Sequence, residues 1–175
     1  MKNSKTRRLV ICALFAALCF VATIIPIPMP MLHGYVNIGD CMVLLCAYTA
    51  GGFFGALSAG AGCALADVVM SYAVYAPATF VIKTLMALAA YVFFKNGFAF
   101  LNAVGCVIAE GIMVCGYLVF EYYLYGSGCL ASIPGNLLQG GVNAVIAFVL
   151  VSVFANNKTL QNLSVCHKKT SDIDK

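Results

Sequence analysis

Long apolar runs make up most of this chain, and short breaks rich in proline, glycine or polar residues separate them. Each break lies where a helix has to end or turn. The runs predict six helices over residues 8–25, 38–50, 53–72, 77–94, 98–123 and 132–156. Most of these runs approach or exceed the length of about 20 residues that crosses the hydrocarbon core of a bilayer. The pattern predicts an all-α integral membrane protein in which six transmembrane helices form a compact bundle.

The break after the first run contains Pro26, Pro28 and Pro30 in alternation, which excludes a helix. An extended segment is therefore expected through His33, Gly34 and Tyr35. The second run that follows is short, and it covers only about 20 Å against a core of about 30 Å. We expect this helix to begin below the outer membrane surface, with the proline-containing segment dipping in above it.

Composition supports the membrane class and excludes several functions. Hydrophobic residues make up 63% of the chain and charged residues only 9%, too few to cover a soluble surface. The basic residues lie at the ends of segments and not on one amphipathic element, so no nucleic acid partner is expected. The nine cysteines include no Cys-x-x-Cys pair, and six of them lie inside apolar runs, so they are interpreted as structural small apolar residues. No phosphate loop, zinc-protease motif or nucleophile elbow is present, so the chain is predicted not to be an enzyme and to hold no cofactor.

The distribution of cations predicts the topology. Six helices place nine of the ten lysines and arginines on one side of the membrane, namely Lys2, Lys5, Arg7, Arg8, Lys95, Lys158, Lys168, Lys169 and Lys175. Positive charge marks the cytoplasmic side, so both termini are expected there. The predicted organisation is a cytoplasmic N-terminus over residues 1–7, a membrane domain over 8–156 and a polar cytoplasmic tail over 157–175.

Three charged residues lie inside the predicted helices, where each costs about 2.5 to 3.5 kcal/mol. They are Asp67, Lys83 and Glu110. Asp67 and Lys83 lie at matching depths of roughly 7 to 9 Å on neighbouring helices, so an ion pair between them is expected. Two roles are open for this pair. The two charges either do no more than neutralise each other, or they line a polar pocket and hold opposite charges for a ligand. The pocket is favoured because other polar residues gather at the same level.

These other residues belong to several helices. Asn136, Gln139 and Asn143 form one stripe on the sixth helix, which suits either contacts between helices or contacts with a ligand. The remaining candidates for a binding site in the outer half are Tyr35, Asn37, Asp40, Tyr75 and Glu121. Glu110 lies deeper, near the middle of the fifth helix. It is a protonated structural carboxyl, a ligand contact or a proton-carrying group, and the sequence leaves these three roles open.

Four segments resemble the S components of energy-coupling-factor (ECF) transporters, which are prokaryotic vitamin importers. The segments are Gly34-Tyr35-Val36-Asn37-Ile38-Gly39-Asp40, Ala64-Leu65-Ala66-Asp67, Tyr75-Ala76-Pro77-Ala78-Thr79-Phe80-Val81-Ile82-Lys83 and Ser132-Ile133-Pro134-Gly135-Asn136. The resemblance extends over about residues 7–155 and is to the riboflavin-type or hydroxymethylpyrimidine-type branch.

The resemblance implies a six-helix protein of the prokaryotic cell membrane that binds a vitamin or vitamin precursor near the extracellular side. It implies partners as well: a transmembrane coupling T component, which docks on the small-residue face of the first helix at Ala13 and Ala17, and two ATPase subunits that use ATP. An acidic pocket with one lysine, amides and tyrosines suits a small heteroaromatic ligand. Hydroxymethylpyrimidine, thiamine or pyridoxine types are expected first, and riboflavin after them.

A self-sufficient proton-coupled secondary carrier is the main alternative, with Asp67 or Glu110 taking up and releasing protons. Many carriers of that kind contain an inverted repeat, and none is obvious in this sequence. A membrane enzyme would need catalytic motifs that the sequence lacks. A scaffold without a ligand is a further alternative, and it predicts that Asp67→Ala and Lys83→Ala alter only stability.

Overall fold

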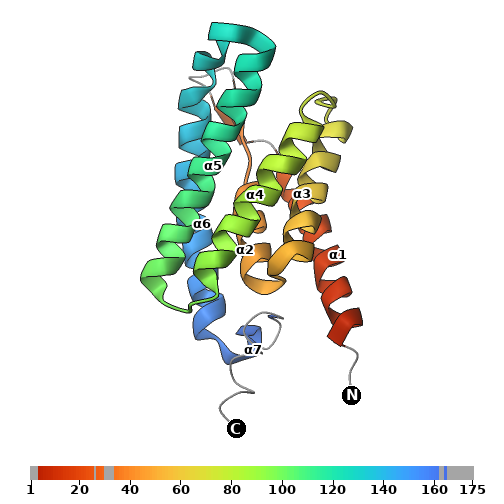
Figure 1. Cartoon of the computed structure of the whole chain (residues 1–175), viewed down its shortest axis with the longest axis vertical. Helices are drawn as coiled ribbons and strands as arrows, with labels where there is room; N and C mark the ends of the chain where they lie inside the picture. Colours follow the sequence, from red (N-terminus) through yellow and green to blue (C-terminus); the bar gives the residue numbers. More distant parts are fainter. Residues whose placement is uncertain (1–3, 26, 30–33, 162–163, 165–175) are drawn as a thin grey trace.

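The computed structural model describes residues 4–25, 27–29, 34–161 and 164. Helices dominate, and a short β-hairpin follows the first of them (Figure 1). The helices are α1 Ser4–Thr23, α2 Gly39–Thr49, α3 Gly52–Val69, α4 Ala76–Phe94, α5 Ala99–Tyr125, α6 Ile133–Asn156 and α7 Lys158–Gln161. The strands are β1 Ile27–Met29 and β2 Gly34–Val36, and a 3-10 helix, η1 Gly126–Ala131, joins α5 to α6.

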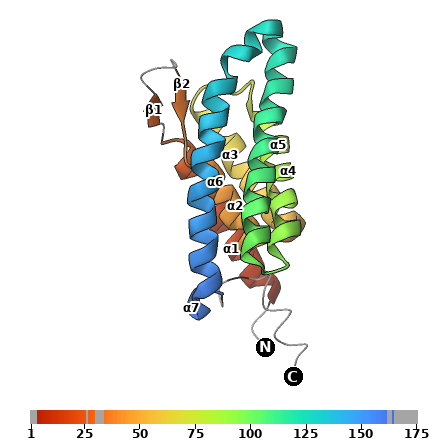
Figure 2. The ribbon, with the colours of Figure 1, turned by 90° about the vertical axis from the view of Figure 1, so that its left-hand side faces the viewer.

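The short helix α2 lies at the centre of the bundle. It packs against α1, α3, α4 and α6, while α1 also packs on α3, α3 on α4, α4 on α5 and α5 on α6 (Figures 1 and 2). Every residue of α2 except Met42 is buried. Because its neighbours surround it, α2 need not present an apolar face to lipid.

Glycine and proline set the helix boundaries as the sequence predicts. Gly51 and Gly52 have φ angles of 53° and 61°, which allow the sharp turn from α2 into α3. Pro77 and Pro134 stand in the first turns of α4 and α6, where proline is tolerated. The third helix ends at Val69 and not at residue 72 as predicted, because the chain turns at Ser71 with a φ of 67°.

The predicted extended segment is confirmed for the residues that the structure describes, and it folds back on itself. β1 and β2 pair antiparallel, with Ile27 opposite Val36, Pro28 opposite Tyr35 and Met29 opposite Gly34. Pro26, Pro30 and His33 lie outside the described residues. The prediction of an all-α fold therefore needs one addition, this hairpin of two three-residue strands.

Five helices among the described residues are long and apolar enough to cross a membrane. They cover Lys5–Thr23, Gly52–Val69, Ala76–Phe94, Ala99–Ala131 and Ile133–Asn156. The remaining predicted span, the second along the chain at residues 38–50, corresponds to α2, which has 11 residues. At a rise of 1.5 Å per residue, α2 is only about 16 Å long.

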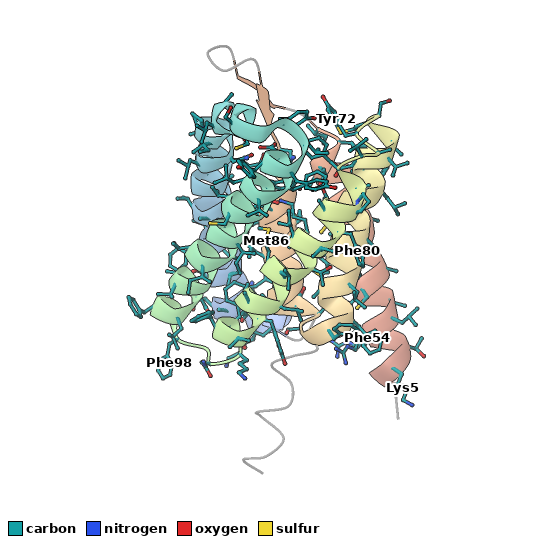
Figure 3. The ribbon with its side chains drawn as sticks, turned by 45° about the horizontal axis from the view of Figure 1, so that its top comes forward. Lys5, Phe54, Tyr72, Phe80, Met86 and Phe98 are labelled. Carbon is teal, nitrogen blue, oxygen red and sulfur yellow. The ribbon has the colours of Figure 1, made fainter. Side chains whose placement is uncertain are left out.

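The bundle has two distinct ends. The end we call the terminal end contains the start of α1, the α4–α5 connection and the end of α6, and the opposite end, the hairpin end, contains the β-hairpin, the α3–α4 turn and η1 (Figures 1 and 2). Figure 3 places Lys5 and Phe98 at the terminal end and Tyr72 at the hairpin end. The start of α1, Lys95 and the end of α6 were predicted to share one side, and they lie at the same end of the bundle.

Two side chains hold the terminal end around α2. Arg8 of α1 donates a hydrogen bond from Nη2 to the carbonyl of Gly51, at 3.3 Å. The buried Ser164 lies 3.3 Å from each of the carbonyl oxygens of Tyr48 and Thr49, to which its hydroxyl donates. These contacts connect segments far apart in sequence to the C-terminal turn of α2 and the glycine turn after it.

Candidate functional site

A buried ion pair joins α2 to α4 in the middle of the hairpin-end half. Lys83 Nζ binds Asp40 Oδ1, and the side chains are 5% and 0% exposed. The second carboxylate oxygen of Asp40 accepts a hydrogen bond of 2.8 Å from Nε2 of Gln139. Lys83 Nζ also lies 5.3 Å from the ring centroid of Tyr117. A buried pair is tolerated when its remaining hydrogen-bonding positions are filled, and this arrangement fills both oxygens of Asp40.

The amides of α6 attach the start of α2 to the bundle. Asn143 Oδ1 accepts the backbone N–H of Cys41 at 3.0 Å, and Asn143 Nδ2 donates to the carbonyl of Asn37 at 2.8 Å. Asn37 in turn accepts the backbone N–H of Gly39 on its side-chain oxygen, at 2.9 Å. The first N–H groups of a helix have no partner within it, and lipid offers them no water. Gln139 and Asn143 therefore act here as contacts between helices. We call Asn37, Asp40, Lys83, Gln139 and Asn143 the central network.

The expected Asp67–Lys83 ion pair is wrong, because Lys83 binds Asp40 instead. Asp67 is half-buried two residues before the end of α3, and its Oδ2 is buried without a hydrogen-bond partner among the described residues. Equal depth on consecutive helices made the pair plausible. The central position of α2 brings Asp40 to Lys83 across a separation of 43 residues, and depth alone does not reveal that arrangement.

Aromatic side chains gather between the central network and the hairpin end. Tyr75 packs edge-on against Phe120 and Tyr72, with ring centroids 5.3 and 6.3 Å away, and its hydroxyl donates to that of Tyr125 at 3.4 Å. The hydroxyl of Tyr117 on α5 forms a hydrogen bond of 2.9 Å with Thr79, which lies one turn after Tyr75 on α4. We call Tyr72, Tyr75, Tyr117, Phe120 and Tyr125 the aromatic cluster, and Figure 3 shows Tyr72 at that end.

The sequence predicted Tyr75 and Glu121 as site residues of this region, but it did not single out Thr79, Tyr117, Phe120 or Tyr125. Thr79 lies one turn after Tyr75 on α4, and Tyr117, Phe120 and Glu121 follow at i, i+3 and i+4 on α5, a spacing that places side chains on one face. That spacing is the signal that could have found them. Glu121 accepts a hydrogen bond from the hydroxyl of Ser132, which connects α5 to the residue before α6.

Glu110 is buried at 4% exposure, and neither of its carboxyl oxygens has a hydrogen-bond partner among the described residues. Gly140 of α6 lies directly opposite, where an added Cβ would stand 3.6 Å from Oε2. Asn102, two turns away on the same face of α5, also has a buried side-chain oxygen without a partner in the described part of the chain. A buried carboxyl in such surroundings is stabilised by a bound donor or by loss of its charge.

The remaining predicted residues are distributed as follows. Asn136 is half-buried one turn nearer the hairpin end than Gln139, and its side chain makes no hydrogen bond with any described residue. The backbone of Tyr35 forms part of β2, and its side chain lies outside the described parts of the structure. Ala13 and Ala17 are exposed on α1.

Within the described residues, eight cysteines are free thiols and no three metal-binding side chains come together.

The chain is similar to known membrane transport proteins over most of its length. The model for the family described as "ECF-type riboflavin transporter, S component" matches residues 3–156, nearly the whole chain. The chain belongs to this family of ECF transporter S components. A solved structure described as the S component of a bacterial ECF transporter has the same fold, with a TM-score of 0.71 and 26% identity over 87% of this chain and 97% of that one.

A curated relative of this S component comes from Pyrococcus woesei and is described as an uncharacterized protein in the gap 3' region. It is 31% identical over 140 residues, which are 74% of this chain and 94% of that protein. The family is one of membrane transporters and not of enzymes. The five described helices that are long and apolar enough to cross a membrane agree with it.

Proposed function

We propose that this S component captures a vitamin at the hairpin end of the bundle and delivers it to an ATP-driven ECF importer. The observation that carries the proposal is the position of the polar and aromatic side chains. The central network and the aromatic cluster occupy the same half of the bundle, on α2, α4, α5 and α6. A few convergent polar groups beside aromatic rings are typical of small-molecule sites.

The proposed topology has the terminal end in the cytoplasm and the hairpin end outside. Lys5, Arg7, Arg8, Lys95 and Lys158 all belong to segments at the terminal end, and the positive-inside rule assigns such an end to the cytoplasm. With α2 added to the five longer helices, the protein has six membrane segments. Its proposed location is the prokaryotic cell membrane. The neighbours of α2 enclose it, so it can be shorter than a lipid-exposed span.

The ligand that we propose first is riboflavin, followed by hydroxymethylpyrimidine or thiamine and by pyridoxine. The family's description favours a flavin, and the aromatic cluster is larger than the sequence indicated. Aromatic rings stack on planar heterocycles. The side chains of Asn136 and Glu110 have no hydrogen-bond partner among the described residues, and they would bind polar ring substituents. Under this proposal Glu110 is a ligand contact.

The proposed partners are the T component and two ATPase subunits, which supply ATP hydrolysis. The exposed positions of Ala13 and Ala17 on α1 support docking of the T component there, because small residues allow two helices to approach closely. The secondary-carrier alternative gains no support from the family match.

The test is ligand binding by the chain purified in detergent. Riboflavin, thiamine, hydroxymethylpyrimidine and pyridoxine are added separately, and thermal unfolding is measured. A ligand at 100 times its Kd stabilises the folded state by about 2.7 kcal/mol. We expect riboflavin to give the largest shift, and Asn136→Ala and Glu110→Gln to reduce it.

Asn156→Ala is the matched control, because Asn156 is an exposed asparagine at the opposite end of α6. It should leave the shift unchanged. If no vitamin stabilises the chain, and the chain alone in liposomes accumulates a solute under a proton gradient, the proposal is overturned in favour of a secondary carrier.

A further inference from the structure

A groove runs along α6 at the terminal end, far from the proposed vitamin site. Its volume is about 600 Å³. Its walls are Phe148, Val149 and Val153 in one part, and Ser152, Asn156, Asn157 and Lys158 in the other. The groove therefore combines an apolar stretch with a polar, cationic one.

The groove opens toward the surroundings of the bundle and not toward its interior. The buried face of α6 contains Gln139, Asn143, Ala147 and Val151. Val149 and Val153 lie on another face and are 54% and 50% exposed. In a membrane, that other face meets lipid.

Along the helix axis, the apolar residues of the groove precede Asn156, Asn157 and Lys158, and Ser152 lies between the two valines. Val149 lies seven residues before Asn156, the last residue of α6, which corresponds to about 10 Å. The apolar part thus lies at the depth of acyl chains, and Lys158 lies just beyond the helix end, where headgroups begin.

The polar part presents donors and one positive charge. Asn157 Oδ1 already accepts the backbone N–H groups of Thr159 and Leu160, at 3.0 and 3.4 Å, so its Nδ2 remains as a donor. Ser152 adds a hydroxyl, and Lys158 adds an exposed ammonium group. Among the described residues, the groove lining contains no carboxylate that would repel an anion.

We propose that this groove binds one anionic phospholipid, with an acyl chain along Phe148, Val149 and Val153 and the phosphate beside Lys158. Charge complementarity selects an anionic headgroup over a zwitterionic one, because a lysine near the surface strengthens binding to anionic lipid. The inference depends on membrane insertion, but neither on the vitamin nor on which side of the membrane the terminal end faces.

Native mass spectrometry of the full chain tests this proposal. The protein is released from nanodiscs that contain equal amounts of phosphatidylglycerol and phosphatidylcholine, and the retained lipids are counted. We expect one retained phosphatidylglycerol, and a preference over phosphatidylcholine that falls about five-fold in Lys158→Gln.

Lys95→Gln is the matched control, since Lys95 is an exposed lysine at the same end but outside the groove. It should keep the preference. Val153→Trp, which places a ring in the apolar part, should reduce retention of both lipids while thermal unfolding still reports a folded protein.

Equal retention of the two lipids by the unmodified chain would overturn the proposal. So would an equal loss of preference in Lys158→Gln and Lys95→Gln, which would reflect only the general surface charge. If the unmodified chain retains no lipid and is dimeric, the groove instead binds a second copy.

Discussion

The two halves of the bundle use the same helices for different purposes. On α6, the buried face presents Gln139 and Asn143 in the hairpin-end half but Ala147 and Val151 in the terminal-end half. On α4, Lys83 and Thr79 give way to Ala87, Ala90 and Phe94. The chemistry of the buried helix faces therefore changes with position along the bundle axis.

The terminal-end half is held by packing of apolar and small side chains. Tyr48 and Phe94 meet edge-on with ring centroids 6.1 Å apart, and both are almost fully buried. Thr49, Asn102 and Ser164 are polar exceptions in that interior, each at 2% exposure or less. Buried polar groups are costly in a membrane. Compared with the terminal-end half, the hairpin-end half contains more of them, and it is the half where we propose that the ligand binds.

The largest expected loss of stability comes from removing one charge of the buried Lys83–Asp40 pair in the hairpin-end half. Lys83→Ala leaves the buried charge of Asp40 without its counter-charge and should destabilise the fold by about 3–5 kcal/mol. Chemical or thermal unfolding in detergent measures the loss. Lys95→Ala, at an exposed lysine, should change nothing, and the double variant Lys83→Met with Asp40→Asn should recover part of the stability. A loss in Lys83→Ala no larger than in Lys95→Ala would contradict the importance of the pair.

Packing between α3 and α4 gives the next largest effect. At Gly60 an added Cβ would lie 2.7 Å from the carbonyl oxygen of Phe80 and would also meet Thr84. Gly60→Ala should therefore cost about 1–3 kcal/mol in unfolding free energy. Gly111→Ala is the control, because no atom lies within 4 Å of the added Cβ there. A neutral Gly60→Ala would show that the two helices separate easily.

The amide contacts to α2 are expected to contribute less than the ion pair. Asn143→Ala removes the hydrogen bonds to Cys41 and Asn37. Hydrogen bonds between membrane helices average about 0.6 kcal/mol each, so we expect a loss of roughly 1–2 kcal/mol. Hydrogen exchange of the first turn of α2 should increase in this variant, and unchanged exchange would show that α6 does not hold that turn.

The smallest expected effect concerns the aromatic cluster, where two variants of Tyr75 separate the contribution of the ring from that of the hydroxyl group. Tyr75→Phe keeps the ring contacts and removes only the hydroxyl bonded to Tyr125, whereas Tyr75→Ala removes both. An aromatic pair is worth about 0.5–1.5 kcal/mol, so riboflavin affinity and stability should fall mainly in Tyr75→Ala. Equal effects of the two variants would assign the role to the hydroxyl group and not to the ring.

The features that the sequence predicts well are local ones. Hydrophobic length, the prolines at the starts of α4 and α6 and the Gly51-Gly52 pair act within a few residues, so the helices and their order could be predicted. The pairing of side chains depends on which helices are neighbours in space. The sequence placed Asp40 at the entrance of a short helix, but it did not reveal that this helix occupies the centre of the bundle beside Lys83.

The contact of Ser164 with α2 has a practical consequence for making shortened forms of this protein. The last membrane-crossing helix ends at Asn156, which would suggest trimming the chain just beyond that residue. Ser164, however, donates to the carbonyls of Tyr48 and Thr49 at the C-terminal turn of α2. A protein cut before Ser164 would leave those carbonyls to find other partners, so a purification tag belongs after this residue.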